Sequence, residues 1–160
     1  MPKLRKSWQA KLNDDNGCPK VEPITERLKA SWGTGTVVIP APLEVDALMR
    51  QVPSGELTTI NEIRKALAVK HGATIGCPIT TGIFAWIAAN AADEQASGGE
   101  KDITPYWRTL RGDGALNQKY PGGVQRQALR LKEEGHTIEF FKGNKLPKVQ
   151  DFEKKLAKLT

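Results

Sequence analysis

The sequence predicts a single α+β domain that is mostly helical and has a winged-helix-like helix-turn-helix core. Apolar residues recur at helical spacing in several segments of the middle and last thirds of the chain. Two of these segments follow each other across a connector, which is the arrangement of a helix-turn-helix. Two short segments, residues 36–39 and 137–141, have the composition or the alternation of strands.

Residues 1–42 are predicted to be an N-terminal extension built of short elements. An apolar stripe at a spacing of four residues predicts a first helix, with Leu4, Trp8 and Leu12 on one side. Residues 13–17 end it, and a second short helix is expected within residues 23–32. Thr36–Ile39 is mostly β-branched and is followed by Pro40, so it predicts a strand.

Residues 43–136 are predicted to form the body of the domain. Its first helix spans residues 43–52 and stops at the Pro-Ser-Gly sequence that follows. Thr59 begins the second helix, because Glu62 three residues later completes a capping box. Gly72 ends that helix, since glycine readily takes the left-handed conformation found after a helix.

A third helix is expected after a connector at residues 73–79. Thr80 or Thr81 caps it, and it runs to about Gln95 through small and apolar residues. The connector is longer than in a typical helix-turn-helix, so periodicity alone supports this interpretation only in part.

The C-terminal part is predicted to pack on the same domain. A fourth helix covers residues 124–134 and ends at Gly135. Residues 137–160 then form a β-hairpin, with its turn at residues 142–145, and a basic helix at residues 152–159.

The charge is unevenly distributed. The net charge is +6, and residues 101–160 carry thirteen Lys and Arg against seven Asp and Glu. Residues 31–100 carry four against seven. A basic region favours nucleic-acid binding, because release of cations from the phosphate backbone drives association. Lys-rich ends of a soluble protein explain the charge about equally well.

The composition favours a reduced, cytoplasmic protein without metal or cofactor. Cys18 and Cys77 are too few for a disulfide framework or a metal site. No stretch approaches the ~20 apolar residues of a membrane span, and the basic N-terminus lacks the apolar region of a signal peptide. We therefore expect a monomer in the cytoplasm with no membrane contact.

Six short motifs, taken in order, resemble the DNA-binding domain of the O6-alkylguanine-DNA alkyltransferases. Each is weak alone, but their order within residues 43–136 makes the resemblance specific. They are Pro53-Ser-Gly-Glu-Leu-Thr-Thr-Ile-Asn-Glu-Ile63, the Ala-Ala-Asn ending at Asn90, Pro105-Tyr-Trp-Arg108, Gly114-Ala-Leu116, Tyr120-Pro-Gly-Gly123 and Leu131-Lys-Glu-Glu-Gly135.

In that family the second helix of the helix-turn-helix enters the minor groove, and the target guanine is flipped out of the duplex. A cysteine thiolate then takes the alkyl group irreversibly. Here the resemblance places Tyr106 at the cysteine and Trp107 at the histidine that deprotonates it. Arg108 matches the family, and Glu134 matches the carboxylate that orients the histidine. A phenol with a pKa of ~10 is a far weaker alkyl acceptor than a thiolate, and an indole cannot act as a base.

The chain therefore resembles the alkyltransferase-like proteins, which lack the cysteine and bind alkylated guanine without repairing it. The resemblance implies that eight residues face DNA: Thr58, Thr59, Ile60, Thr80, Thr81, Ala85, Asn90 and Arg108. It also implies a lesion or ligand pocket bordered by Tyr106, Trp107, Tyr120 and Glu134. Ile60 replaces the tyrosine that rotates the base, and Thr81 or Gly82 replaces the arginine that fills the vacated stack. An apolar wedge at Ile60 would still unstack a base step.

Several residues carry two interpretations. Tyr106 and Trp107 either stack on a flat ligand or fill the old pocket. Trp86 fits the core better than a groove contact. Glu134 is either exposed or held by a specific partner, since a carboxylate at a helix C-terminus opposes the helix dipole. Cys77 fits an inert buried thiol better than a substitute nucleophile. The C-terminal lysines contact phosphate or are simply solvated.

The leading hypothesis is a non-enzymatic, alkyltransferase-like protein that binds double-stranded DNA, recognises O6-alkylguanine and passes the lesion to an excision-repair protein. The alternative is a scaffold of the same fold that binds a protein or small ligand through the altered pocket, with little DNA affinity. A third hypothesis, an enzyme that uses Cys77, lacks an obvious base near the thiol.

Overall fold

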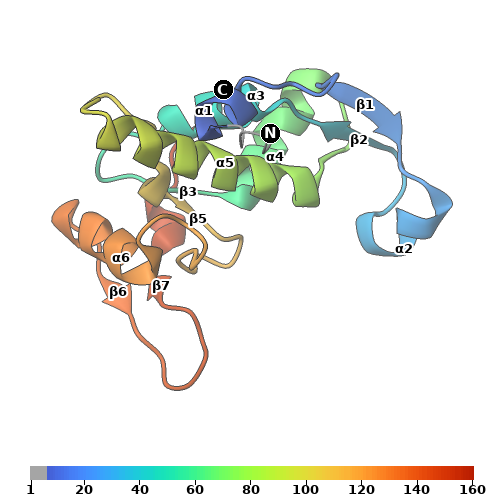
Figure 1. Ribbon diagram of the computed structural model, residues 1–160. Coiled ribbons are helices and arrows are strands. Elements are labelled where there is room, and N and C mark those ends of the chain that lie inside the picture. Colours follow the sequence, from blue (N-terminus) through green and yellow to red (C-terminus); the bar gives the residue numbers. More distant parts are fainter. Residues whose placement is uncertain (1–6) are drawn as a thin grey trace.

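The computed structural model describes residues 7–160, and helices form its centre (Figure 1). The helices and 3-10 segments are α1 (Trp8–Leu12), η1 (Glu26–Leu28), α2 (Lys29–Trp32), α3 (Pro42–Arg50), α4 (Ile60–His71), α5 (Pro78–Ser97), η2 (Tyr106–Arg108), α6 (Gly123–Glu133) and η3 (Phe152–Lys155). Helix α5 has 20 residues and packs against α1, α3 and α4. Helix α5 therefore joins these three helices in one packed group.

Strands of the described residues form three small sheets that join distant parts of the chain. Strand β2 pairs antiparallel with β1 and parallel with β4. Strand β3 pairs in parallel with β5, and β6 pairs antiparallel with β7. Their bounds are β1 (Lys20–Pro23), β2 (Thr36–Ile39), β3 (Thr58–Thr59), β4 (Ile75–Gly76), β5 (Thr109–Leu110), β6 (Ile138–Glu139) and β7 (Lys148–Val149). The mixture of helices with small sheets makes the fold α+β, as the sequence predicts.

The predicted ends of α4 are confirmed. The Thr59 hydroxyl accepts a hydrogen bond from the backbone N–H of Glu62 at 3.2 Å, which satisfies one of the free donors of the first turn. Gly72 follows the last turn in the left-handed conformation, with φ of 64°. Because β3 leads directly into α4 and pairs with β5, the start of this helix lies beside the segment that follows η2.

Helix α5 begins earlier than predicted, and the expected cap at Thr80 or Thr81 is wrong. Cys77 is the N-cap, and its Sγ accepts a hydrogen bond from the backbone N–H of Thr80 at 3.5 Å. Pro78 follows in the first turn, where its missing N–H leaves no hydrogen bond unmade. Cys77 is buried, as expected for an inert thiol.

The N-terminal segment contains a strand, β1, in addition to the predicted short helices and the strand β2. The first helix is confirmed for Trp8 and Leu12, whereas Leu4 lies outside the described residues. Strand β1 is not predicted, and Pro23 ends this strand instead of beginning a helix. Since β1 and β2 share a sheet with β4, residues 20–39 are joined by backbone hydrogen bonds to the connector between α4 and α5.

The C-terminal helix is shorter than predicted. The 3-10 segment η3 replaces the helix expected at residues 152–159, because the chain beyond it is extended and pairs with Leu57. The Leu57 N–H donates to the carbonyl of Lys155 at 2.9 Å, and the Ala157 N–H donates to the carbonyl of Leu57 at 2.8 Å. The predicted hairpin is present with shorter strands and a longer loop, residues 140–147.

The small side chains of α5 face the protein core. Buried alanines form this inner side: Ala85, Ala88, Ala89, Ala91 and Ala92. Because alanine has no atoms beyond Cβ, neighbouring helices approach α5 closely. Ile79 and Ile83 lie on the opposite side and are 60% and 45% exposed. The outer side of the first turns is therefore apolar and open to solvent.

We expect Gly76 and Gly82 to respond to alanine in opposite ways. A Cβ on Gly76 would lie 2.7 Å from the carbonyl oxygen of Arg64, so β4 or α4 must move, at a cost of about 1–3 kcal/mol. A Cβ on Gly82 meets no atom within 4 Å, and alanine there should stabilise α5 by about 1 kcal/mol. Urea unfolding of both variants checks this. Equal changes in the two free energies of unfolding would contradict the close packing of β4 on α4.

Candidate nucleic-acid interface

The Pro-Tyr-Trp-Arg segment forms a filled corner of the core. Tyr106 and Trp107 are 2% and 7% exposed, and their rings meet edge to face with centroids 5.4 Å apart. Tyr120 packs on the other side of Tyr106 in the same manner, at 5.5 Å. Gln127 holds the segment in place, because its Nε2 donates to the carbonyl of Trp107 at 3.1 Å. Tyr106 and Tyr120 therefore fill this corner by packing and border no pocket, which corrects that part of the prediction. Trp107 does border a hollow, of about 500 Å³, on the side of Arg50 and Arg130.

Arg108 and Glu134 form a shielded ion pair behind this corner. Arg108 Nε donates to both carboxylate oxygens at 3.0 and 3.1 Å, and Nη2 donates to Oε2 at 2.6 Å. Nη1 donates to the carbonyl of Val52 at 2.7 Å. Burial alone raises the pKa of Glu134, but the hydrogen bonds from Arg108 and its positive charge bring it below its ordinary value. Glu134 thus has a specific partner, and Arg108 is engaged with the protein rather than directed at DNA.

Both tyrosines of the chain should remain protonated in the folded protein well above pH 10. Burial raises the pKa of Tyr106, and it raises that of the fully enclosed Tyr120 strongly. Because the folded-state values lie above those of the unfolded chain, this contribution to stability is present below pH ~10 and is lost as the pH rises through the folded values. Ultraviolet titration of tyrosinate checks this. Ionisation of either tyrosine at its ordinary pKa without unfolding would contradict the closed corner.

A groove of about 770 Å³ lies along the outer side of α5. Its walls come from three segments: the first turns of α5, the start of α4 and the turn after β5. The lining residues are Ile60, Asn61, Ile79, Gly82, Ile83, Trp86, Arg111, Gly112, Asn117 and Lys119. We call it the α5 groove. The groove is apolar along the helix and polar at the opposite rim. These two surfaces complement the apolar base and the charged phosphate of a nucleotide.

The opposite rim of the α5 groove carries two positively charged side chains. Arg111 and Lys119 are exposed, and among residues 7–160 no carboxylate pairs with either of them. Gly112 allows the turn to approach α4, since a Cβ there would lie 2.5 Å from the Asn61 amide nitrogen. The rim is therefore held close to the helices and can attract an anion.

The acidic residues of α5 are engaged at its other end. The Glu94 carboxylate accepts hydrogen bonds from the backbone N–H groups of Trp8 and Gln9 at 3.1 and 3.2 Å, so it caps α1. Asp93 pairs with Arg126 at 3.1 Å. Both carboxylates lie in the C-terminal half of α5, away from the first turns of the helix that line the groove.

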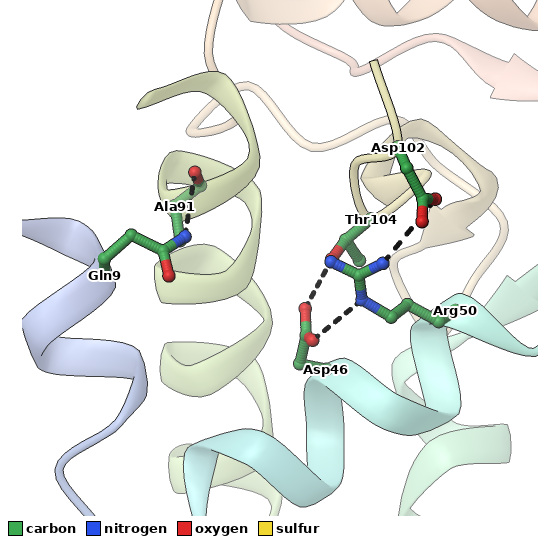
Figure 2. Close-up of polar contacts among 6 residues, drawn as sticks. All are labelled: Gln9, Asp46, Arg50, Ala91, Asp102 and Thr104. Atoms are coloured by element: carbon green, nitrogen blue, oxygen red, sulfur yellow. Dashed lines mark hydrogen bonds and ion pairs between the residues drawn. The ribbon is translucent and has the colours of Figure 1, made fainter. Parts of the chain in front are cut away.

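The polar loop after α5 is tied down to α3, as Figure 2 shows. Thr104 Oγ1 donates to Asp46 at 2.6 Å, and the other oxygen of that carboxylate accepts from Arg50 at 3.1 Å. Arg50 also reaches Asp102 at 3.9 Å. On the opposite side of α5, Gln9 Nε2 donates to the Ala91 carbonyl at 3.4 Å (Figure 2). The C-terminal half of α5 is therefore held by α1, and the loop that follows α5 is held by α3.

Most residues expected to face DNA lie elsewhere. Ile60 lines the α5 groove, while Thr80 and Asn90 are half-buried. The Asn90 amide donates to the Trp86 carbonyl at 2.9 Å. The remaining side chains expected at the surface are buried or paired: Thr58, Thr59, Thr81, Ala85 and Arg108. The placement of the threonines and Ala85 is corrected because β3 and the inner side of α5 are buried, whereas Arg108 is turned toward Glu134.

Only some of the unpredicted groove residues could have been identified from the sequence. Ile79 and Ile83 are spaced four apart on the side opposite Ala85, so a helical projection of α5 separates them from the core positions. Arg111 and Lys119 had no such signal, since they reach the groove through the pairing of β5 with β3. Trp86 serves both sides, because it lines the groove and meets Trp8 edge to face at 4.8 Å.

Residues 7–160 contain neither a cluster of metal ligands nor a membrane-spanning helix. No group of three or more His, Cys, Asp or Glu side chains there is arranged to hold a metal ion. In the same part of the chain, every helix is too short or too polar to cross a membrane.

Comparison with known proteins gives a fold and no sequence family. No family model matches the chain, and no curated protein is significantly similar to it. Two crystal structures of an alkyltransferase-like protein from S. pombe are similar. One is S. pombe ATL in complex with DNA, with a TM-score of 0.52 and 19% identity over 73% of this chain and 94% of that one. The other is S. pombe Atl1 in complex with damaged DNA containing O6-carboxymethylguanine, with a TM-score of 0.46 and 21% identity over the same shares of the two chains. The protein thus has an alkyltransferase-like fold.

Proposed function

We propose that this protein binds double-stranded DNA through the α5 groove and does no chemistry on it. The groove itself supports this proposal most directly. An apolar wall on α5 faces a rim with two cations, Arg111 and Lys119, that have no ion-pair partner among residues 7–160. Phosphates bind such cations with release of counterions, while apolar side chains at a groove wall contact sugars and base edges. Helices α4 and α5 then act as the helix-turn-helix, with the outer side of α5 toward the duplex.

We further propose lesion recognition at the same site: the α5 groove accepts an O6-alkylguanine that is flipped out of the base stack. Ile60 stands at its edge as an apolar wedge, which unstacks a base step at a cost that contacts to the bent duplex offset. Asn61 and Asn117 supply amide donors and acceptors for the edge of a base. The isoleucines of α5 would take the alkyl group.

The absence of alkyl transfer follows from the closed corner. Tyr106 is buried, and burial keeps its pKa above the ordinary value, so the phenolate that could attack a carbon is scarce at neutral pH. Trp107 carries no basic nitrogen. Cys77 is only 5% exposed, so its thiol is shielded from a DNA substrate. Incubation with an alkylated oligonucleotide should therefore leave the mass of the intact protein unchanged.

A fluorescence-anisotropy titration tests the proposal. The duplexes are plain, with O6-methylguanine and with a bulkier O6-alkyl group, each at two salt concentrations. We expect binding that weakens with salt, with log K falling by about 0.9 per phosphate contact for each unit of log salt, and tighter binding of the modified duplexes. Equal affinity for all three duplexes would contradict lesion recognition but would still support DNA binding. No binding at low salt would remove both.

A second function is favoured by one observation. Ile79 and Ile83 are exposed next to each other on α5, and such apolar pairs also occur where proteins or small ligands bind. In that case the scaffold would bind its ligand in the α5 groove with little DNA affinity. Loss of all DNA binding at low salt, together with a folded protein, is the result that would favour this alternative.

A further inference from the structure

A second hollow lies directly beside the α5 groove and shares Arg111 with it. Its volume is about 420 Å³, and it lies between the turn after β5 and the loop that joins β6 to β7. In Figure 1 this loop projects from the body of the molecule beyond α6. The hollow is lined by Arg111, Asp113, Ala115, Phe141, Asn144, Lys145, Leu146 and Lys148. We call it the loop cleft.

The base of the loop cleft is fixed by backbone hydrogen bonds. The Leu116 N–H donates to the carbonyl of Pro147 at 2.8 Å, and the Val149 N–H donates to the carbonyl of Gly114 at 3.1 Å. The turn closes on itself, since the Arg111 N–H donates to the carbonyl of Ala115 at 2.9 Å. The turn after β5 is thus one wall of both hollows, and a ligand passing over it would enter both.

The charge of the loop cleft complements a phosphate backbone. Three cations, Arg111, Lys145 and Lys148, face one carboxylate, Asp113. Lys148 lies 3.8 Å from that carboxylate, and Asp113 also accepts a hydrogen bond from the Ala115 N–H at 3.1 Å. Within residues 7–160 no carboxylate pairs with Lys145. The positive rim of the α5 groove therefore continues along the loop.

The loop cleft differs from a site that binds only phosphate, because an aromatic side chain lines it. Phe141 is 40% exposed and lines the cleft, whereas its neighbour Phe140 lies under the Lys132 ammonium, 5.2 Å from its ring centroid. Contacts to duplex phosphates use cations and need no exposed ring. Unpaired bases stack on aromatic side chains while cations follow their backbone. An aromatic ring beside three cations is thus the chemistry of a single strand.

We infer that the loop cleft binds an unpaired nucleotide of a strand that continues from the duplex held in the α5 groove. The inference rests on the proposed function and makes its preferred ligand a junction between double-stranded and single-stranded DNA. Phe141 stacks on the base, and Lys145 with Arg111 contacts the phosphates on either side of it.

The test is an anisotropy titration of the full chain with four DNAs: a blunt duplex, the same duplex with a short 3′ overhang, the same with a short 5′ overhang, and the single strand alone. We expect at least one overhang duplex to bind about tenfold more tightly than the blunt duplex, as one stacked base allows. Phe141→Ala should abolish that advantage and leave blunt-duplex binding unchanged. Lys145→Gln should reduce it and lower the salt slope by about 0.7, the value for one single-strand phosphate.

Matched controls lie on the same loop. Phe140→Ala removes an exposed ring outside the cleft, and Lys142→Gln removes a charge outside it, so both should retain the preference for the overhang. Blunt-duplex binding without any overhang advantage, or an advantage that survives Phe141→Ala, would overturn this inference and leave the proposed function intact. Failure of all four DNAs to bind at low salt would overturn both.

Discussion

Gly82→Glu is expected to weaken DNA binding by about 100-fold or more while leaving the protein folded. Gly82 lines the α5 groove, and a Cβ there meets no atom within 4 Å, so glutamate would extend into the space that DNA is proposed to occupy. Its charge would also repel phosphate. Because glutamate favours helix more than glycine does, α5 itself should not be weakened. The loss corresponds to about 2.7 kcal/mol of binding free energy, measured by anisotropy with the plain duplex at low salt.

Val69→Glu is the matched control for this variant. Val69 lies on α4, is 84% exposed and is not part of the α5 groove, so the same charge is added at a remote helical position. DNA affinity should change by less than about twofold, the effect of a distant, screened charge. Similar losses in the two variants would mean that net charge alone governs binding, and Gly82→Glu with full affinity would move the DNA site away from α5.

Arg108→Ala is expected to reduce the free energy of unfolding by about 3 kcal/mol. Removal of the guanidinium leaves the Glu134 carboxylate without its partner, although both side chains are only 15% and 13% exposed in the pair. The Val52 carbonyl loses its donor as well. For a chain of 160 residues this corresponds to a fall in Tm of about 10 °C, which thermal unfolding can measure.

The pH dependence separates an unpaired charge from lost packing. In the wild type the pKa of Glu134 is lowered in the fold, so the pair's contribution is present above the unfolded-state value and is lost as the pH falls through the folded one. In Arg108→Ala the deficit should therefore shrink in acid, as Glu134 becomes neutral. The double variant Arg108→Met with Glu134→Leu should recover most of the stability at neutral pH. A deficit that is independent of pH and equal in the double variant would point to packing alone.

The local elements could be predicted from the sequence where neighbouring residues decide them. The Thr59 cap with Glu62, the left-handed Gly72 and the strand Thr36–Ile39 depend on a few adjacent side chains, and all three are confirmed. The prediction failed where distant backbone competes. Leu57 pairs with the residues after η3, so the expected C-terminal helix stops at Lys155. Cys77 and Pro78 start α5 before the threonines that ranked higher as caps.

The sequence by itself predicted an α+β protein and an order of motifs that resembles the alkyltransferases, and this resemblance implies tyrosine and tryptophan at the positions of the nucleophile and its base. Those conclusions need only residue identity and spacing. Tertiary structure alone decided which side of α5 faces solvent, that Tyr106 packs between Trp107 and Tyr120, and that Arg108 is held by Glu134. The physical reason is that exposure and ion pairing depend on the residues that the strand pairings β3–β5 and β6–β7 bring together across long stretches of chain.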